Sequence, residues 1–139
     1  MVARIVRSAD IDLSDVLRRS PVADIPLARD KLRAFIFASC EVWAGYVDTE
    51  VACVCGLIPP TLLSDYAYLW LLNTDIVEQH QFLFIRHSQI WLQGILKRYS
   101  YITGHVELEN VKAIRWLKWL GATLGEPEMG KIPFRIRAR

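Results

Sequence analysis

The apolar residues of this chain recur at two kinds of spacing in successive segments, and these spacings predict its strands and helices. A spacing of two residues, typical of half-buried strands, marks residues 3–9, 101–109 and 134–139. Residues 41–47 and 51–58 are expected to form a β-hairpin around residues 48–50. Residues 66–73 are apolar at almost every position, as expected of a central strand that is buried on both faces. A further short strand is expected at residues 123–124, which makes six to seven strands in all.

Spacings of three and four residues predict the helices. We expect one helix over residues 12–19, a second from about residue 24, a long one over 75–98 and a last one between Asn110 and Gly121. Asp75, with Glu78 three residues later, resembles a capping box at the start of the long helix. Asn110 can cap the last helix with its side chain, and Gly121 can end it in the left-handed conformation.

The resulting order of elements, β-α-α-β-β-β-α-β-α-β, predicts a mixed α/β (α+β) fold. A chain of 139 residues has the size of one domain, so we expect residues 1–139 to form a single domain. Its mixed central sheet is expected to carry helices on both faces. The hydrophobic content of 53% fits such a covered sheet, an apolar contact between two copies in a homodimer, or both.

The net charge and the length of the apolar runs argue against nucleic-acid binding and against a membrane span. Seventeen Lys and Arg residues against fifteen Asp and Glu residues leave a net charge of +2, so we expect no nucleic-acid partner. The longest uncharged run, residues 51–64, is too short to span a bilayer and contains Pro59 and Pro60. We therefore expect no membrane span, and residues 1–10 lack the apolar core of a signal peptide.

The chain has three cysteines, Cys40, Cys53 and Cys55, an odd number at spacings that do not suit a disulfide framework. Cys53 and Cys55 lie two residues apart, so they share one face of a strand and could share a metal ion. Zinc takes four ligands, however, and the sequence has no second pair. We therefore expect no metal site, interpret these cysteines as small buried hydrophobic residues, and expect a reducing cytosol.

The last strand and helix carry the most specific pattern in the chain. The segment NVKAIRWLKWLGA, residues 110–122, resembles the last strand–helix unit of the GNAT superfamily of acyl-CoA N-acyltransferases. More narrowly, WLLNTD (residues 70–75), the helix after it and AIRWLKWLGA (residues 113–122) resemble GNAT-like proteins of tailed phages, a group that includes the internal virion protein A family. The resemblance covers most of the chain, from about residue 4 to residue 134.

The resemblance implies a site for an acyl-CoA cofactor, acetyl-CoA, where strands 66–73 and 101–109 separate. It places the backbone of Leu71, Leu72 and Asn73 along the cofactor arm, with Asn110 also in contact with that arm. As a plain helix cap, Asn110 would look identical in the sequence.

The resemblance also implies a catalytic centre on the polar face of strand 101–109. His105 and Glu107 are the candidates for the general base, because they lie two residues apart on that face. The alternative is that both belong to an ordinary solvated strand face. Many GNAT enzymes carry a Tyr in the last helix as general acid, and here that position is Leu117, which cannot transfer a proton.

The turn before the long helix departs from the GNAT pattern. The family has Gln/Arg-x-x-Gly-x-Gly/Ala at this point, where the backbone must approach the pyrophosphate closely. Residues 73–80 read NTDIVEQH and contain no glycine. Asp75 and Glu78 place negative charge at the same point, so the phosphate-binding motif is absent.

Three functional hypotheses follow. We favour a GNAT-like phage protein associated with the virion or its morphogenesis, located in the host cytoplasm or in the virion, with virion or host proteins as partners. The first alternative is an active acetyl-CoA-dependent N-acetyltransferase that acts on a host protein or a small amine. The second alternative is a non-catalytic module that binds a host protein.

Overall fold

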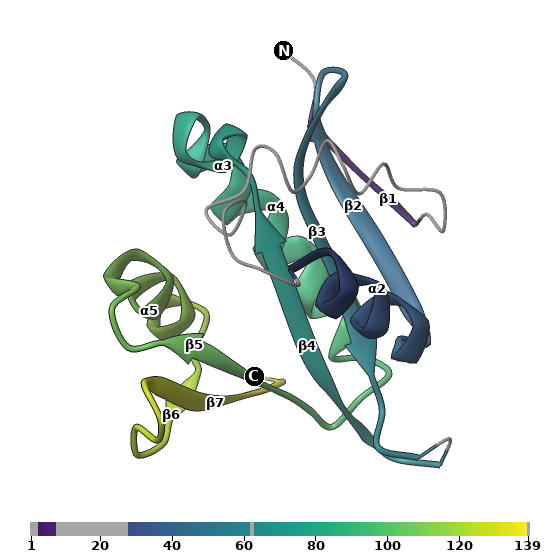
Figure 1. Ribbon diagram of the computed structural model, residues 1–139, viewed down its shortest axis with the longest axis vertical. Helices are drawn as coiled ribbons and strands as arrows, with labels where there is room; N and C mark the ends of the chain where they lie inside the picture. Colours follow the sequence, from purple (N-terminus) through teal and green to yellow (C-terminus); the bar gives the residue numbers. More distant parts are fainter. Residues whose placement is uncertain (1–2, 8–27, 62, 139) are drawn as a thin grey trace. The chain divides into compact units, whose positions relative to one another are not determined.

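The computed structural model describes residues 3–7, 28–61 and 63–138 (Figure 1). The chain forms two compact units, one of Met1–Ile58 and Trp70–Phe84 (unit 1) and one of Pro59–Leu69 and Ile85–Arg139 (unit 2). Two elements, β4 (Tyr66–Asn73) and α4 (Gln81–Ile95), begin in one unit and end in the other. The helix predicted over residues 12–19 and the predicted start of the second helix lie outside the described residues.

Unit 1 is built around a β-hairpin. β1 (Ala3–Arg7) pairs antiparallel with β2 (Glu41–Val47), and β2 pairs antiparallel with β3 (Glu50–Ile58), as Figure 1 shows. Asp48 makes the tight turn of the hairpin with a φ of 54°, a left-handed conformation that Asp adopts more readily than most residues. The predicted hairpin of residues 41–47 and 51–58 is therefore confirmed.

Two helices contact β3 in unit 1, α2 (Ala28–Ala38) and α3 (Asp75–Gln79). Trp70 of β4 stacks on Phe35 of α2 with ring centroids 5.9 Å apart. Its Nε1 donates to Ser39 Oγ at 2.7 Å, which satisfies the one polar atom of a buried ring. A core cluster of this unit consists of the side chains of Val47, Ala52, Cys53, Ile76 and Val77.

Unit 2 contains the parallel pairing of the fold. The first half of β4 pairs parallel with β5 (Tyr101–Glu107), so the two strands that we expected to flank the site are neighbours. β7 (Lys131–Arg137) pairs antiparallel with β5 along its full length, and the short β6 (Thr123–Leu124) pairs with β7. The predicted mixed sheet of six to seven strands is thus confirmed, with seven strands among the residues that the structure describes.

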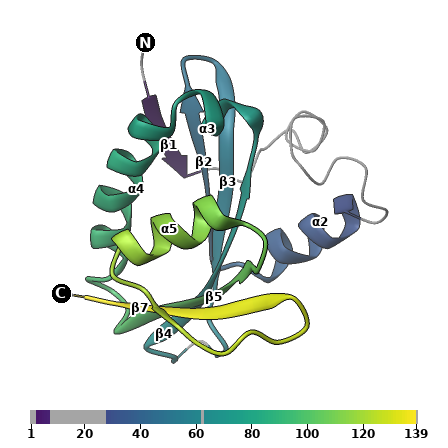
Figure 2. The ribbon, with the colours of Figure 1, turned by 90° about the vertical axis from the view of Figure 1, so that its left-hand side faces the viewer.

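The alternation along β5 and β7 gives unit 2 one buried and one polar strand face. The buried face consists of Ile102, Gly104, Val106, Ile132, Phe134 and Ile136. Figure 2 shows α5 (Val111–Trp119) beside this pair of strands. Trp116 of α5 donates from Nε1 to Ser88 Oγ of α4 at 3.0 Å, which links the two helices.

Several predicted boundaries were wrong. The single helix predicted over residues 75–98 is two helices, because His80 leaves the helical conformation with φ −133° and ψ 44° and ends α3. Its N-cap is Thr74 and not Asp75. The strand predicted over residues 101–109 ends at Glu107, where the N–H of Asn110 donates to Glu107 O in the turn that leads to α5.

Gly104 is needed for close packing in unit 2. A Cβ at this position would lie 2.4 Å from Phe134 Cζ and 2.9 Å from Leu69 O. We therefore expect Gly104→Ala to lower the free energy of unfolding by about 1–3 kcal/mol, because Phe134 is buried and the backbone carbonyl cannot yield.

Gly94 provides the matched control for this prediction, because a Cβ added there meets nothing within 4 Å. It lies inside α4, so Gly94→Ala should raise the free energy of unfolding by roughly 0.5–1 kcal/mol. Chemical denaturation of the two variants measures both effects. Equal stability of the two variants would contradict the packing argument.

Candidate functional site

One candidate region is the end of β4 in unit 1, where Thr74 follows the strand. Thr74 is 2% exposed, and its N–H donates to Ala52 O at 2.8 Å. Its hydroxyl donates to the backbone of β3, with Oγ1 lying 2.8 Å from Val51 O and 3.0 Å from Ala52 O. The same oxygen accepts from the N–H of Ile76 at 3.3 Å and so caps α3.

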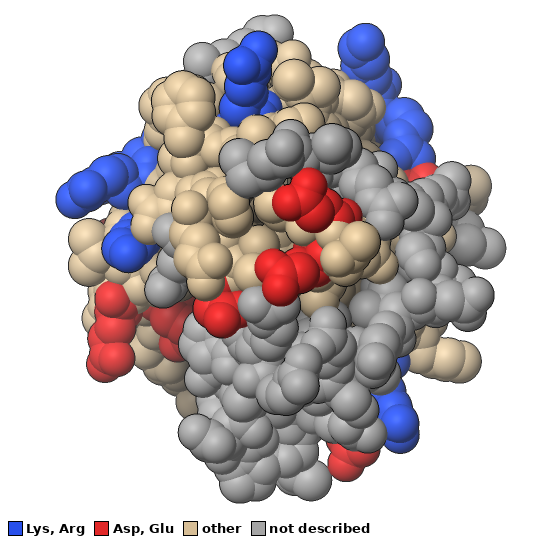
Figure 3. Space-filling view, turned by 90° about the horizontal axis from the view of Figure 1, so that it is seen from above, with Lys and Arg blue, Asp and Glu red and all other residues tan. Residues whose placement is uncertain are grey.

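These hydrogen bonds use the backbone donors that a pyrophosphate would need. The N–H of Ile76 donates to the Thr74 side chain, and the N–H of Val77 donates to Thr74 O at 3.2 Å. Asp75 adds an exposed carboxylate at the first position of this five-residue helix. Figure 3 shows the molecule from above the view of Figure 1, with several Asp and Glu side chains near the centre of this face and Lys and Arg toward its margins. The start of α3 therefore does not fit the pyrophosphate of CoA.

The three predicted cofactor-arm residues lie at the end of β4, next to Thr74. Leu71, Leu72 and Asn73 are half-buried. The side-chain oxygen Oδ1 of Asn73 is buried and accepts no hydrogen bond within the described residues. A buried acceptor without a donor is unfavourable, so this atom could receive an N–H group from a ligand. Contact of these residues with a cofactor arm stays a prediction.

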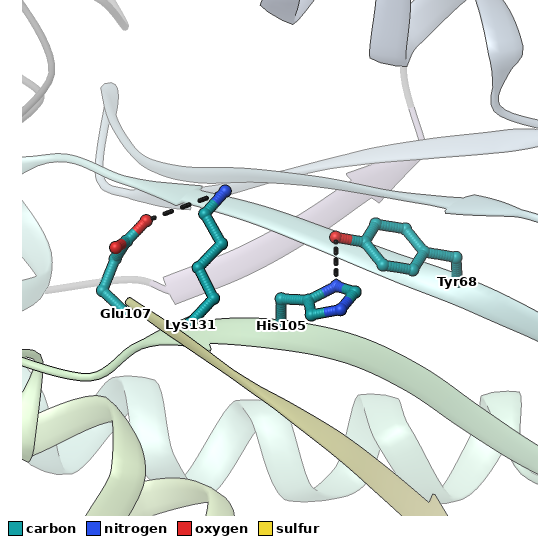
Figure 4. A network of polar contacts seen from close by, with 4 residues as sticks. All are labelled: Tyr68, His105, Glu107 and Lys131. Carbon is teal, nitrogen blue, oxygen red and sulfur yellow. Dashed lines mark hydrogen bonds and ion pairs between the residues drawn. The ribbon is translucent and has the colours of Figure 1, made fainter. Parts of the chain in front are cut away.

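Another candidate region is the polar face of β5 in unit 2 (Figure 4). His105 is exposed, and its Nδ1 lies 3.2 Å from the hydroxyl of Tyr68 on β4. Partial burial raises the pKa of Tyr68, so this phenol stays protonated at neutral pH. The phenol can donate to Nδ1 or accept from a protonated Nδ1, and in the second case the other ring nitrogen of the neutral imidazole keeps its lone pair.

Glu107 lies on the same face but has its own partner. Its carboxylate forms an ion pair with Lys131 of β7 at 3.9 Å, and the side chains are 65% and 45% exposed. At this exposure the pair contributes little to stability. The structure therefore places both predicted general-base candidates on one face, His105 beside Tyr68 and Glu107 beside Lys131. Their catalytic role stays a prediction.

A further candidate region of unit 2 is the start of α5. Asn110 caps this helix as predicted, because its Oδ1 accepts from the N–H of Ala113 at 3.1 Å. Leu117, which occupies the place of the family's general acid, is 2% exposed and packs inside unit 2. Contact between Asn110 and a cofactor stays a prediction.

The cysteines of β3 are buried, as expected from the sequence. Burial raises the pKa of the Cys53 thiol to about 11 and that of Cys55 well above its ordinary value, so neither is a thiolate at neutral pH. Cys40, by contrast, is exposed. Within the described ranges, no three His, Cys, Asp or Glu residues come together as metal ligands would. No helix of the described part is long and apolar enough to cross a membrane.

Comparison with solved structures identifies the fold. A Bacillus subtilis acetyltransferase, solved in complex with CoA, superposes with a TM-score of 0.75 at 10% identity and covers 99% of this chain and 100% of its own. The ribosomal-protein-S18-alanine N-acetyltransferase of Escherichia coli gives a TM-score of 0.71 at 16% identity, covering 98% and 94%. The GNAT domain of PAT from S. lividans gives 0.69 at 15% identity, covering 98% and 90%.

These likenesses establish that the chain has the GNAT acetyltransferase fold, as the sequence predicted. At such low identities they establish the fold alone. No protein-family model and no curated protein sequence matches the chain. The functional conclusion therefore depends on the site itself.

The importance of Thr74 can be tested by Thr74→Val, which keeps the shape of the side chain and removes its hydroxyl. The variant leaves buried groups of β3 and α3 without their partner, so we expect the free energy of unfolding to fall by about 1–3 kcal/mol. Thr123→Val is the control, because Thr123 is exposed and its substitution should change stability by less than about 0.5 kcal/mol. Urea denaturation measures both, and an unchanged Thr74→Val protein would refute the role of this hydroxyl.

Proposed function

We propose that this protein is a GNAT-fold binding protein of a tailed phage that works in virion assembly and does not transfer acyl groups. The observation that carries this proposal is the use of the Ile76 and Val77 N–H groups by Thr74. A helix start whose donors are already bonded has little left to offer an anion. Binding pyrophosphate there would require the cap to open.

The charge at the start of α3 also opposes binding of a pyrophosphate. A carboxylate in the first turn of a helix is stabilising by roughly 0.3–1 kcal/mol, because it faces the positive end of the helix dipole. Asp75 holds that position in α3 and would repel a pyrophosphate group. Leu117 provides no proton for a departing thiolate. The departures from the GNAT pattern thus affect both cofactor binding and chemistry.

The phage role rests on the resemblance of residues 70–75 and 113–122 to GNAT-like proteins of tailed phages. It implies virion or host proteins as partners and a location in the host cytoplasm or in the virion. Affinity purification of the tagged protein from infected cells tests it. We expect virion or host proteins to co-purify, and a clean monomer without partners would count against the proposal.

One specific observation favours the alternative of an active N-acetyltransferase, the contact between His105 and Tyr68. If the Nδ1–H of a neutral His105 donates to the phenol oxygen, the other ring nitrogen keeps its lone pair and could take a proton from an amine on the polar face of β5. The buried Oδ1 of Asn73 offers an acceptor at the end of β4. In this alternative the protein uses acetyl-CoA and acetylates a host protein or a small amine, with His105 or Glu107 as the base.

Cofactor binding decides between the two functions. A ligand present at 100 times its Kd raises the free energy of unfolding by about 2.7 kcal/mol. We expect no change in Tm with millimolar acetyl-CoA, measured beside a GNAT enzyme that binds the cofactor. A clear rise in Tm for this protein would overturn the proposed function.

If acetyl-CoA does bind, the base can be tested directly. His105→Gln should then abolish acetylation of a polyamine or peptide amine without altering the acetyl-CoA affinity, since His105 faces the acceptor in this alternative. Glu107→Gln serves as the comparison. Full activity of His105→Gln would exclude this residue as the base.

A further inference from the structure

The polar face of unit 2 carries a group of aromatic and basic side chains at the end of β5 away from Glu107. The rings of Tyr66 and Tyr101 stack with centroids 4.7 Å apart and an angle of 7° between their planes. The guanidinium carbon of Arg135 lies over the Tyr101 ring at 4.3 Å from its centroid, and that of Arg137 lies at 5.6 Å. We call these four residues the Tyr–Arg platform.

The two arginines of the platform are exposed and have unused hydrogen-bonding capacity. In the part of the chain that the structure describes, no carboxylate forms an ion pair with Arg135 or Arg137. Lys131, the other cation of β7 on this face, is by contrast paired with Glu107. Asp65, which precedes Tyr66, accepts a hydrogen bond from Ser100 Oγ at 3.0 Å. The platform thus presents two positive charges that its own unit does not neutralise.

The contact with Tyr101 prepares both guanidinium groups for a ligand. A guanidinium that lies over an aromatic ring loses side-chain freedom before binding, and it keeps N–H donors for a carboxylate. The entropy cost of ordering a long side chain is then smaller when the ligand arrives. The two arginines are therefore better prepared to bind an anion than two freely moving, solvated arginines would be.

The spacing of the two arginines matches an extended peptide. Arg135 and Arg137 are alternate residues of β7, so their Cα atoms are roughly 6.6 Å apart along the strand. Alternate side chains of an extended peptide have the same spacing. An acidic residue at every second position would therefore bring one carboxylate to each guanidinium, in the bidentate geometry that Arg favours.

A nucleic acid is a poorer fit for the same face. Proteins that bind single strands offer free aromatic rings on which bases stack, together with a broad basic surface. The Tyr101 ring here is already stacked on Tyr66 and lies under Arg135. The net charge of the whole chain is only +2.

We propose that the Tyr–Arg platform binds an extended acidic segment of a partner protein, with Asp or Glu at alternate positions. This inference deepens the proposed function, on which it rests, because it names the chemistry of the partner that a non-catalytic GNAT-fold protein would bind. It requires no cofactor.

The test uses the full chain and two fluorescein-labelled peptides, one of alternating Glu and Thr and one of alternating Gln and Thr. Fluorescence anisotropy at low ionic strength should show binding of the Glu peptide. The Gln peptide should bind about tenfold more weakly, because it lacks the two charge-assisted contacts. Binding of the Glu peptide should weaken as salt is added.

Variants then locate the site. Arg135→Gln combined with Arg137→Gln should weaken binding of the Glu peptide about tenfold. Lys112→Gln combined with Arg115→Gln removes the same charge from the exposed side of α5 and should leave binding unchanged. Tyr101→Phe keeps the ring and should bind normally, whereas Tyr101→Leu should bind more weakly although its charge is the same.

Three results would overturn the inference. They are equal binding of the two peptides, equal effects of the two double variants, and tighter binding of a single-stranded oligonucleotide that is lost in the Arg135/Arg137 double variant. Circular dichroism of each variant confirms that it is folded. A rise in Tm with acetyl-CoA would refute the proposed function but would not affect these results, so the two can fail separately.

Discussion

Thr74 ties the end of β4 to β3 through hydrogen bonds in a region that excludes water. Its backbone N–H and its hydroxyl both donate to this strand, and the hydroxyl oxygen also receives the N–H of Ile76. Because the group is 2% exposed, water cannot replace a lost partner. The donors that stabilise unit 1 are therefore the same donors that an anion at the start of α3 would require. Stability and anion binding compete here for one set of backbone groups.

The regular parts of the fold were predictable because their cause lies in the order of apolar residues. β4 coincides with the apolar run at residues 66–73, and β5 and β7 show the expected alternation between a buried and a polar face. The break at His80 was not predictable in this way. The apolar spacing continues through it, and the break depends on backbone angles that the surrounding structure imposes. The cap at Thr74 was not predicted, because the spacing of Asp75 and Glu78 matches a capping box that starts one residue later.

The candidate site was predictable only on the strand where its residues alternate. His105 and Glu107 were placed on one polar face of β5 from the sequence, and the structure shows them there. Tyr68 was missed because its strand was interpreted as buried on both faces, although a Tyr has a polar end that prefers a partner. Lys131 was missed because the last strand was predicted to start at residue 134 and in fact starts three residues earlier. The signal for Tyr68 was its position two residues after Tyr66, since the parallel register brings both onto the polar face of β5.

The division of β5 and β7 into two faces explains how a GNAT fold can be kept while its chemistry changes. The buried residues Ile102, Val106 and Ile136 remove apolar surface from water, and this burial is the main driving force of folding. Residues on the opposite face contribute little to that term, so they can vary without loss of the core. On this face the guanidinium group of Arg135 lies over the Tyr101 ring, and His105 contacts the phenol of Tyr68. Substitutions on the polar face can thus change what this surface contacts while the buried face stays the same.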